Sequence, residues 1–203
     1  CEYNECDGVN EAPIITSNGA GSTASISFAE NNTSAVTTVT STDFDPGDIA
    51  AYSISGTDVD DFTINSSSGV LTFTSSPNFE VPTDSNTDNV YTVIVTVTDN
   101  GALTDSQTIT VTVEALNEAP VITSNSGGSS ASISVNENTS TITTVTSTDV
   151  DASATATYSI SGTDVDDFWI DSGTGILTFF SIPDYEISTD SGTDNTYIVI
   201  VTI

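Results

Sequence analysis

The sequence YSISGTDVDDF at residues 52–62 returns without a single change at residues 158–168, 106 positions later. Other words return at nearly the same interval: NEAPI at residues 10–14 as NEAPV at 117–121, and NFE at 78–80 as DYE at 184–186. A period of about 106 residues is the size of one β-sandwich module. The chain is therefore a tandem repeat of one unit of about 106 residues.

Within each unit the local pattern predicts β-strands. Apolar residues alternate with Thr and Ser over residues 91–97 and 109–113, and Ile26 and Phe28 alternate with serines. Period-2 alternation bounded by Gly, Asn and Asp is typical of half-buried strands joined by turns. Ser68-Gly69, Thr174-Gly175 and Asp99-Asn100-Gly101 fit tight turns that need a positive φ. No segment keeps a helical period, so we expect an all-β chain with about seven strands per unit in two packed antiparallel sheets.

The repeat sets the predicted domain boundaries: an N-terminal segment at 1–9, a first domain at 10–116 and a second at 117–203. The second unit stops inside the strand that matches residues 91–97, so we expect a sandwich that lacks its last strand. Two interpretations stay open. The sequence is a piece of a longer chain, which is the simpler reading, or a neighbouring chain supplies the strand by β-augmentation.

The charge balance excludes several classes of partner. The 203 residues hold no Lys, Arg or His and 29 Asp and Glu, a formal net charge of −29. Such a chain repels nucleic acid and anionic lipid, because phosphate binding depends on Lys and Arg. No stretch approaches the roughly 20 apolar residues of a membrane helix, so no membrane insertion is expected. Disorder is rejected, because hydrophobic residues reach 36% and fall in alternating runs.

The same composition argues against an enzyme. A nucleophilic Ser or Thr needs a base, and the chain has neither His nor Lys to serve as one. Paired carboxylates could hydrolyse glycosides, but the acids repeat at the ends of modules, which favours a joint over a cleft. The two cysteines, Cys1 and Cys6, leave a small disulfide loop and a lipid-modified Cys1 both open, and are too few for zinc.

Acidic residues recur in a fixed order, and Ca²⁺ takes six to eight oxygen ligands of this kind. Each unit has a Glu after its first long strand, an Asp-x-Asp before the Tyr-Ser-Ile strand, and a three-residue acidic element after the Gly turn. The two units are joined by Asn-Glu-Ala-Pro. The other acids, Asp58, Asp60, Asp61, Asp84 and Asp88 with their copies, are expected to form solvated loops.

This ordered set resembles the cadherin repeat and its bacterial cadherin-like relatives over nearly the whole chain from Asn10 onward. The Phe-x-Ile…Gly-x-Leu pattern at residues 62–71 also matches. The resemblance implies two tandem Ig-like Greek-key β-sandwiches with Ca²⁺ bound where successive modules meet. Carried over by position, the complete junction would use Glu30, Asn78, Glu80, Asn117, Glu118, Asp149 and Asp151. Half-sites would be formed by Asn10, Glu11, Asp43, Asp45 and Asp99 before the first unit, and by Glu137, Asp184 and Glu186 after the second.

The resemblance further implies an extracellular or cell-surface location and a structural or adhesive role. The chain would be a segment of a rod, adhesin or filament, stiffened by Ca²⁺ and partnered by further modules in line or by self-association. An alternative is a module that binds carbohydrate or protein through Trp169, Phe180 or Tyr185. Sequons at Asn31, Asn32, Asn65 and Asn138 permit N-linked glycans, and the Ser/Thr content permits O-linked glycans.

Overall fold

The computed structural model describes residues 9–203, in which the chain divides into two compact units. Unit 1 ends at Leu116 and unit 2 comprises Asn117–Ile203. Within residues 9–203 the helical segments are two single 3₁₀ turns, Val59–Asp61 and Val165–Asp167. The search of these residues finds no helix that is long and apolar enough to span a bilayer. Cys1 and Cys6, with the disulfide suggested for them, lie outside the described residues.

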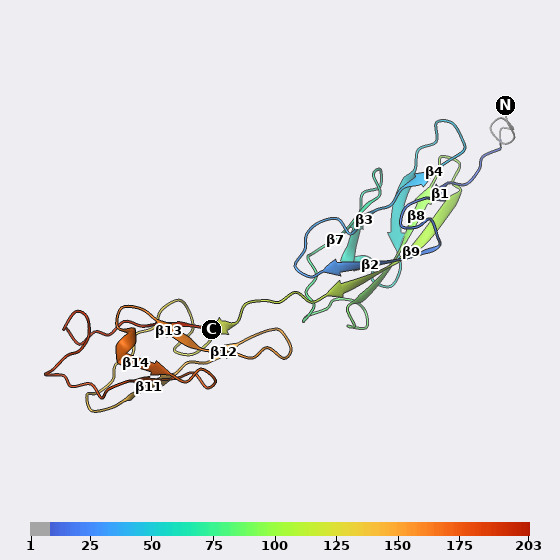
Figure 1. Ribbon diagram of the computed structural model, residues 1–203. Helices are drawn as coiled ribbons and strands as arrows, with labels where there is room; N and C mark the ends of the chain where they lie inside the picture. Colours follow the sequence, from blue (N-terminus) through green and yellow to red (C-terminus); the bar gives the residue numbers. More distant parts are fainter. Residues whose placement is uncertain (1–8) are drawn as a thin grey trace. The chain divides into compact units, whose positions relative to one another are not determined.

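Unit 1 is a β-sandwich (Figure 1). One sheet has the order β2-β9-β8-β5, formed by Thr23–Ala29, Thr104–Glu114, Val90–Thr98 and Ala51–Ser55. The other has the order β3-β7-β6, formed by Thr37–Thr38, Val70–Phe73 and Phe62–Ile64. A short pair, β1 (Ile14–Ile15) with β4 (Ser41–Thr42), completes the unit.

The prediction of wholly antiparallel sheets is wrong at one edge of the larger sheet. β2 pairs with β9 in parallel, from Thr23 opposite Thr108 to Ala29 opposite Glu114. A tight hairpin forces neighbouring strands to run antiparallel, but β2 and β9 are far apart in the sequence and are free of that constraint. The other strand pairs of unit 1 are antiparallel, as expected.

The alternating pattern places the core of unit 1 as predicted. Along β8 every second residue is buried, and Tyr91, Val93 and Val95 have no exposed surface. Side chains from β9 meet those from the opposite sheet in one cluster, in which Leu71 is also fully buried. Each fully buried aliphatic side chain contributes about 1.5–3 kcal/mol, so this interface between the sheets is the main source of stability.

Two of the three predicted glycine turns are confirmed, and the third is different. Gly69 and Gly175 have φ values of +68° and +69°, and a Cβ on Gly69 would collide with the carbonyl oxygen of Val39. At the third turn the left-handed residue is Ala102, with φ +68°. A Cβ on Gly101 would meet the end of the exposed Asn10 side chain, which would have to move.

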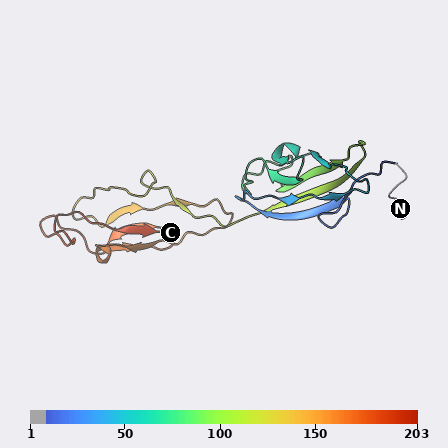
Figure 2. The ribbon, with the colours of Figure 1, turned by 90° about the horizontal axis from the view of Figure 1, so that it is seen from above.

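Unit 2 repeats this plan with shorter strands. β11 (Thr141–Thr144), β15 (Ile176–Phe179) and β14 (Phe168–Ile170) form one sheet. β13 (Ser159–Ser161) pairs with β16 (Ile200–Thr202), and β10 (Val121–Ile122) pairs with β12 (Ser147–Thr148). Figure 2 shows how much longer the strands of unit 1 are than those of unit 2.

The expectation that the second sandwich lacks its last strand is confirmed. No segment of residues 117–203 takes the place of β9 beside β16. Residues 131–135 are not a strand, although their sequence ASISV closely repeats ASISF at 24–28, which lies in β2.

Candidate metal centres

The first cluster of acids belongs to unit 1 and combines two loops, the one between β4 and β5 and the one between β8 and β9. Asp43 follows β4, Asp99 follows β8, and Asp48 lies in the loop before β5. One carboxylate oxygen from each lies within 4.8 Å of the other two. Asp99 is buried, and its two oxygens accept hydrogen bonds from the Leu103 N–H and the Asn10 amide, each at 2.8 Å.

Two oxygens of this cluster are buried without a hydrogen-bond partner, Oδ2 of Asp43 and Oδ2 of Asp48. The other oxygen of each is held, since Asp43 Oδ1 accepts the Asp45 N–H and Asp48 Oδ1 accepts the Asn100 amide, both at 2.9 Å. Buried carboxylate oxygens need a donor or a cation, and this chain has no cationic side chain. The donor set, all oxygen and strongly anionic, fits Ca²⁺.

Asp48 is the residue that sequence reasoning missed. The predicted motif was Asp43-x-Asp45, but Asp45 uses its Oδ2 to accept the Glu11 N–H at 2.7 Å. Asp48 takes its place in the cluster, because the Pro46-Gly47 turn brings the chain back toward Asp99. The signal was present in the Asp-Pro-Gly-Asp sequence, which is typical of a tight turn with both acids at its ends.

The Asp-x-Asp element of unit 2 repeats the arrangement of unit 1. The Glu118 N–H donates to Asp151 Oδ2 at 2.8 Å, and the Asp151 N–H donates to Asp149 Oδ1 at 3.0 Å. Asn117 donates from its amide to the Glu118 carbonyl at 3.0 Å. The backbone of Glu118 and the side chains of Asp149 and Asp151 are thus linked by hydrogen bonds within unit 2.

Glu30 is the most buried acid of unit 1, with 1% of its surface exposed. Its two oxygens accept the backbone N–H of Phe79 at 2.9 Å and of Leu116 at 2.7 Å. A carboxylate oxygen of Glu80 lies within 4.8 Å of one of Glu30. The predicted pair Glu30 and Glu80 is therefore assembled. The exposed Asn78 accepts the Val81 N–H at 2.7 Å through its amide oxygen.

The third cluster belongs to unit 2 and consists of Glu137, Asp184 and Glu186, whose oxygens lie within 4.8 Å of one another. Glu137 Oε2 accepts the Tyr185 N–H at 3.0 Å, as Glu30 accepts that of Phe79 in unit 1. All three residues are exposed. The predicted half-site is thus assembled by the same local contact in both repeats.

The expectation that the remaining acids lie in solvated loops is wrong for four of them. Asp58, Asp84, Asp164 and Asp190 are between 2% and 5% exposed. Asp58 accepts the N–H of Ser85 at 2.9 Å and that of Thr92 at 2.7 Å, and Asp164 repeats this with Ser191 and Ile198. Backbone amides neutralise these carboxylates, which fasten the long loop before β8 to the sandwich. Asp60, Asp88, Asp166 and Asp194 are exposed, as predicted.

Two acids of unit 2 have shifted pKa values. The Thr174 N–H, followed by the Thr174 hydroxyl and the Gly173 N–H, lowers the pKa of Asp171 below its ordinary 3.8. For Asp190, burial raises the pKa, but the backbone N–H groups of Asp194 and Asn195 prevail, and the pKa is lowered. Both side chains are therefore firmly ionised at neutral pH.

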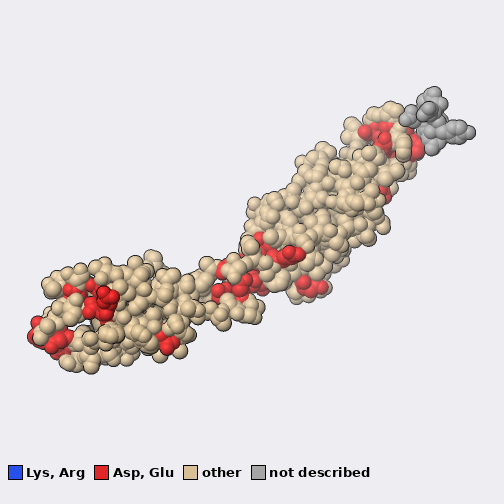
Figure 3. Space-filling model, in the orientation of Figure 1, with Lys and Arg blue, Asp and Glu red and all other residues tan. Residues whose placement is uncertain are grey.

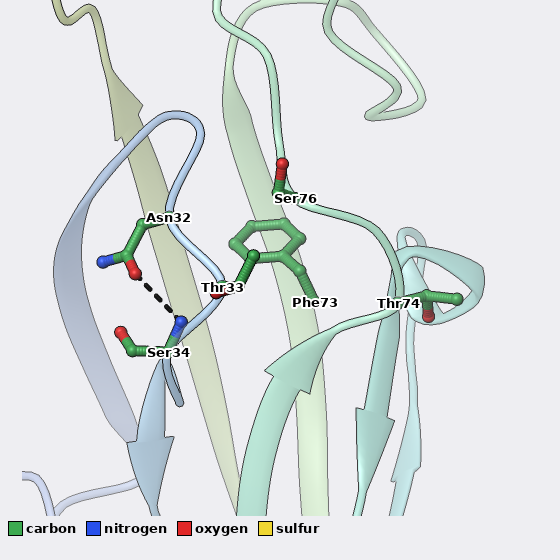
Figure 4. A pocket seen from close by; sticks show the side chains of 6 residues that line it. All are labelled: Asn32, Thr33, Ser34, Phe73, Thr74 and Ser76. Atoms are coloured by element: carbon green, nitrogen blue, oxygen red, sulfur yellow. Dashed lines mark hydrogen bonds between the residues drawn. The ribbon is translucent and has the colours of Figure 1, made fainter.

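A hollow in unit 1 lies between residues 32–34 and residues 73–76. The hollow shown in Figure 4 is lined by Asn32, Thr33, Ser34, Phe73, Thr74 and Ser76. Asn32 accepts the Ser34 N–H at 2.9 Å and so closes a local turn. By contrast, Figure 3 shows that the acidic side chains on the visible face gather into separate patches.

Comparison with known proteins shows what unit 1 is similar to. Residues 24–115 match the model of the cadherin domain family. No curated protein matches this chain. The acids Glu30, Asp43 and Asp99 lie within the matched stretch.

Solved cadherin ectodomains share the fold of both units. Human protocadherin-24 EC1-2 (Form II) is 20% identical, with a TM-score of 0.57, and the match covers 96% of this chain and 95% of that one. Drosophila N-cadherin EC1-4 is 22% identical with a TM-score of 0.55, covering 95% and 45%. A protocadherin gammaB7 EC3-6 cis-dimer is 19% identical with a TM-score of 0.50, covering 87% and 45%.

The chain spans about half the length of the first solved structures that it matches, 56% for mouse cadherin-23 EC22-24 and 45% for Drosophila N-cadherin EC1-4. These likenesses, all under 25% identity, establish an Ig-like β-sandwich of the cadherin type in each unit. Residues 117–203, although short of a strand, keep the same fold.

Proposed function

We propose that this chain is a calcium-binding adhesion segment of an extracellular rod or filament, without enzymatic activity. Its cadherin domain supports an adhesion-type extracellular module. The solved structures of similar fold contain several such modules in line, and one of them is a cis-dimer. Further modules in line and self-association are the partners that this likeness suggests for the present chain.

The observation that carries the proposal is the Asp43, Asp48 and Asp99 cluster with its two buried oxygens that lack a partner. Three carboxylates within 4.8 Å repel one another strongly unless a cation lies among them. Mg²⁺ usually keeps several waters, whereas Ca²⁺ accepts many protein oxygens in a flexible geometry. The Glu30–Glu80 pair and the Glu137, Asp184 and Glu186 cluster are proposed as further Ca²⁺ ligands.

Calcium stiffening is the second part of the proposal and rests on the chain order of the acids. Each unit fixes the backbone nearest the linker through an acid of its own, Glu30 at Leu116 and Asp151 at Glu118. By the cadherin resemblance, Ca²⁺ bound by these acids would stiffen the linker. Free Ca²⁺ at 100 times Kd would add about 2.7 kcal/mol if only that form binds the ion.

Small-angle scattering and thermal melting, each with Ca²⁺ and with EGTA, test both parts. We expect a larger maximum dimension and a higher Tm with Ca²⁺. A higher Tm with an unchanged maximum dimension would support calcium binding and contradict calcium stiffening. Identical curves in both measurements would remove the calcium proposal and leave the fold untouched.

A binding function is the second candidate, favoured by aromatic side chains on the surface of unit 2. Trp169 is 50% exposed and Phe180 75% exposed. In β14, Trp169 lies opposite Thr178 of β15, whereas unit 1 has Thr63 and Thr72 there, joined by a 2.8 Å hydrogen bond. If Trp169→Ala abolishes binding on a glycan or protein array while the Ca²⁺ response persists, the chain is a binding module.

A further inference from the structure

The outer face of one sheet differs in chemistry between the two repeats. Three exposed polar residues of unit 1 are replaced in unit 2 by large apolar residues: Thr63 by Trp169, Thr74 by Phe180 and Ser76 by Ile182. The three replacements are 50%, 75% and 62% exposed, in that order. Exposed apolar side chains that lie together on a surface mark a site of interaction.

Strand pairing places the two aromatic side chains on the same face. Phe168 of β14 is buried, so its neighbour Trp169 points outward. Trp169 lies opposite Thr178 of β15. Phe180 extends this pairing beyond β15, because its N–H donates to the Asp167 carbonyl at 2.8 Å. Trp169 and Phe180 are therefore diagonal neighbours on the outer face of the sheet.

The exposure of this face does not depend on the strand that unit 2 lacks. The position of that strand is in the other sheet, beside β16. In unit 1, where β9 is present, the corresponding residues Thr63, Thr74 and Ser76 are exposed as well. Large apolar residues at these positions therefore face solvent because of the sheet to which they belong.

Acidic side chains border the same positions in unit 1. Asp60, Asp61 and residues of the loop 74–83 line one hollow of about 330 Å³. Asp61 accepts the Thr83 hydroxyl through Oδ1, and its carbonyl accepts the Thr74 N–H at 2.8 Å. The hollow is thus lined by two carboxylates and by positions at which the repeats differ.

Unit 2 keeps these acids and the contacts that place them. The two adjacent acids are repeated as Asp166 and Asp167. Asp167 Oδ1 accepts the Thr189 hydroxyl at 2.9 Å, and the Asp167 carbonyl accepts the Phe180 N–H at 2.8 Å. Asp166 is exposed. In unit 2 the acids therefore border an apolar surface, whereas in unit 1 they border a polar one.

The chemistry of this face selects a cationic partner. Aromatic rings attract the charged groups of Lys and Arg, and the apolar stems of these side chains cover aliphatic surface. Carboxylates beside the rings add complementary charge. The chain has no Lys, Arg or His and a formal net charge of −29, so a second copy brings no cation and is repelled. A separate protein must supply the cation.

We propose that the outer face of β14 and β15, with Trp169, Phe180 and Ile182, binds a basic segment of a separate protein. Lys or Arg side chains of that segment lie over the two aromatic rings, and their charged groups pair with Asp166 and Asp167. The proposal rests on the binding function given above as the second candidate, and it names the chemistry of the partner. Unit 1, with threonine and serine at the same positions, lacks this site.

Trp169 is the only tryptophan of the chain, so its fluorescence reports on the site directly. The probe is the peptide RTRTRTR, whose arginines share one side when it is extended, with the neutral QTQTQTQ as its control. The full chain is titrated in EGTA, so that the outcome does not depend on calcium, and at about 0.1 M salt, which screens distant charges. We expect a saturable change of Trp169 fluorescence with the basic peptide and none with the neutral one.

Matched variants in the two repeats locate the binding. Phe180→Thr gives unit 2 the residue of unit 1 and should weaken the Kd of the basic peptide about fivefold. Asp166→Asn should weaken it about threefold. Asp60→Asn, the same change in unit 1, should leave Kd unchanged. Phe44→Thr should also leave it unchanged, although Phe44 is 58% exposed and lies between two acids in the sequence.

The converse change builds the face in unit 1. The triple variant Thr63→Trp, Thr74→Phe and Ser76→Ile should add a second site and so double the stoichiometry measured with a labelled peptide. A single site in this variant would contradict the role given to the three side chains.

The proposal is overturned if the basic peptide leaves Trp169 fluorescence unaltered up to about 10⁻² M, or if Phe44→Thr weakens binding as much as Phe180→Thr. Binding of a neutral glycan in place of the peptide would refute the basic partner and keep the binding function. Self-association in sedimentation that Phe180→Thr abolishes would refute it in favour of a second copy. If peptide and glycan both fail to bind, the binding function falls with the proposal, and the calcium proposal is unaffected.

Discussion

The Oε1 atom of Glu30 accepts the backbone N–H of Leu116 at 2.7 Å across 86 positions of sequence. The same carboxylate accepts the Phe79 N–H through Oε2, so one buried side chain fastens two loops at the end of unit 1. In a chain without Lys, Arg or His, backbone amides take the part that ion pairs take elsewhere. We propose that Ca²⁺ supplies the positive charge that the neutral backbone amides cannot.

Glu30→Gln should destabilise unit 1 even without metal. The amide keeps one acceptor and turns the other oxygen into a donor that faces a backbone N–H, leaving that N–H unsatisfied. A cost of about 1–3 kcal/mol is expected for a buried group of this kind. Urea unfolding in EGTA measures it, with the exposed Glu114→Gln as the control. Equal stability of the two variants would contradict the role given to Glu30.

Asp48→Asn should weaken calcium binding without harming the fold. The change removes one of three clustered charges and keeps an oxygen that accepts the Asn100 amide. We expect Ca²⁺ affinity at this cluster to fall at least tenfold, about 1.4 kcal/mol. The Tm in EGTA should stay the same or rise, since like-charge repulsion is relieved. Calorimetric titration beside the exposed Asp60→Asn tests it, and unaltered affinity would exclude Asp48 as a ligand.

The Asp58→Asn variant tests whether a buried acid contributes more to the unfolding free energy than an exposed one. Both oxygens of Asp58 accept backbone N–H groups, those of Ser85 and Thr92. The variant should lose about 1–3 kcal/mol of unfolding free energy, whereas Asp60→Asn, two positions away and exposed, should stay within about 0.5 kcal/mol of the parent. Hydrogen exchange should also show faster opening of residues 84–89. Similar stability for both variants would mean that the burial of Asp58 is not energetically important.

Unit 2 should lose stability as the pH falls below about 4. The pKa values of Asp171 and Asp190 are lowered in the folded state, so their stabilisation is present above the unfolded pKa and is lost as the pH falls through the folded pKa. The loss of stability is measured as the Tm in EGTA and high salt at pH values between 6 and 2.5. Asp171→Asn should flatten part of the slope, and a Tm that rises on acidification in the parent chain would run against this assignment.

The sequence predicted the fold well where pairing partners lie within the same repeat. Alternation over residues 91–97 identified β8, and the repeat identified its copy. It could not show that β2 pairs in parallel with β9, because period-2 patterning fixes which side chains face inward but not the direction of a neighbouring strand. The sequence also predicted a positive φ at Gly101, whereas the residue with a positive φ in this turn is its neighbour Ala102.

For the candidate site, the order of the acids predicted which residues would meet within each unit. Glu30 with Glu80, and Glu137 with Asp184 and Glu186, are assembled. Asp48 was missed because its copy in unit 2 is Ala154, so a search by repetition passes over it. Asp58 and Asp84 were misjudged as solvated, because burial by backbone amides leaves no trace in composition. The repetition of Asp58 and Asp84 as Asp164 and Asp190 in unit 2 was the sequence feature that indicated a structural role.

Calorimetric titration of the EGTA-treated full chain with Ca²⁺ measures directly whether the acidic clusters bind the ion. We expect saturable binding, with dissociation constants that reach about 10⁻⁴–10⁻³ M as in other extracellular modules. Binding should weaken in Asp48→Asn and in Asp43→Asn, the two residues with buried oxygens that lack partners. A flat titration up to 10⁻² M Ca²⁺, or binding that neither variant alters, would contradict it.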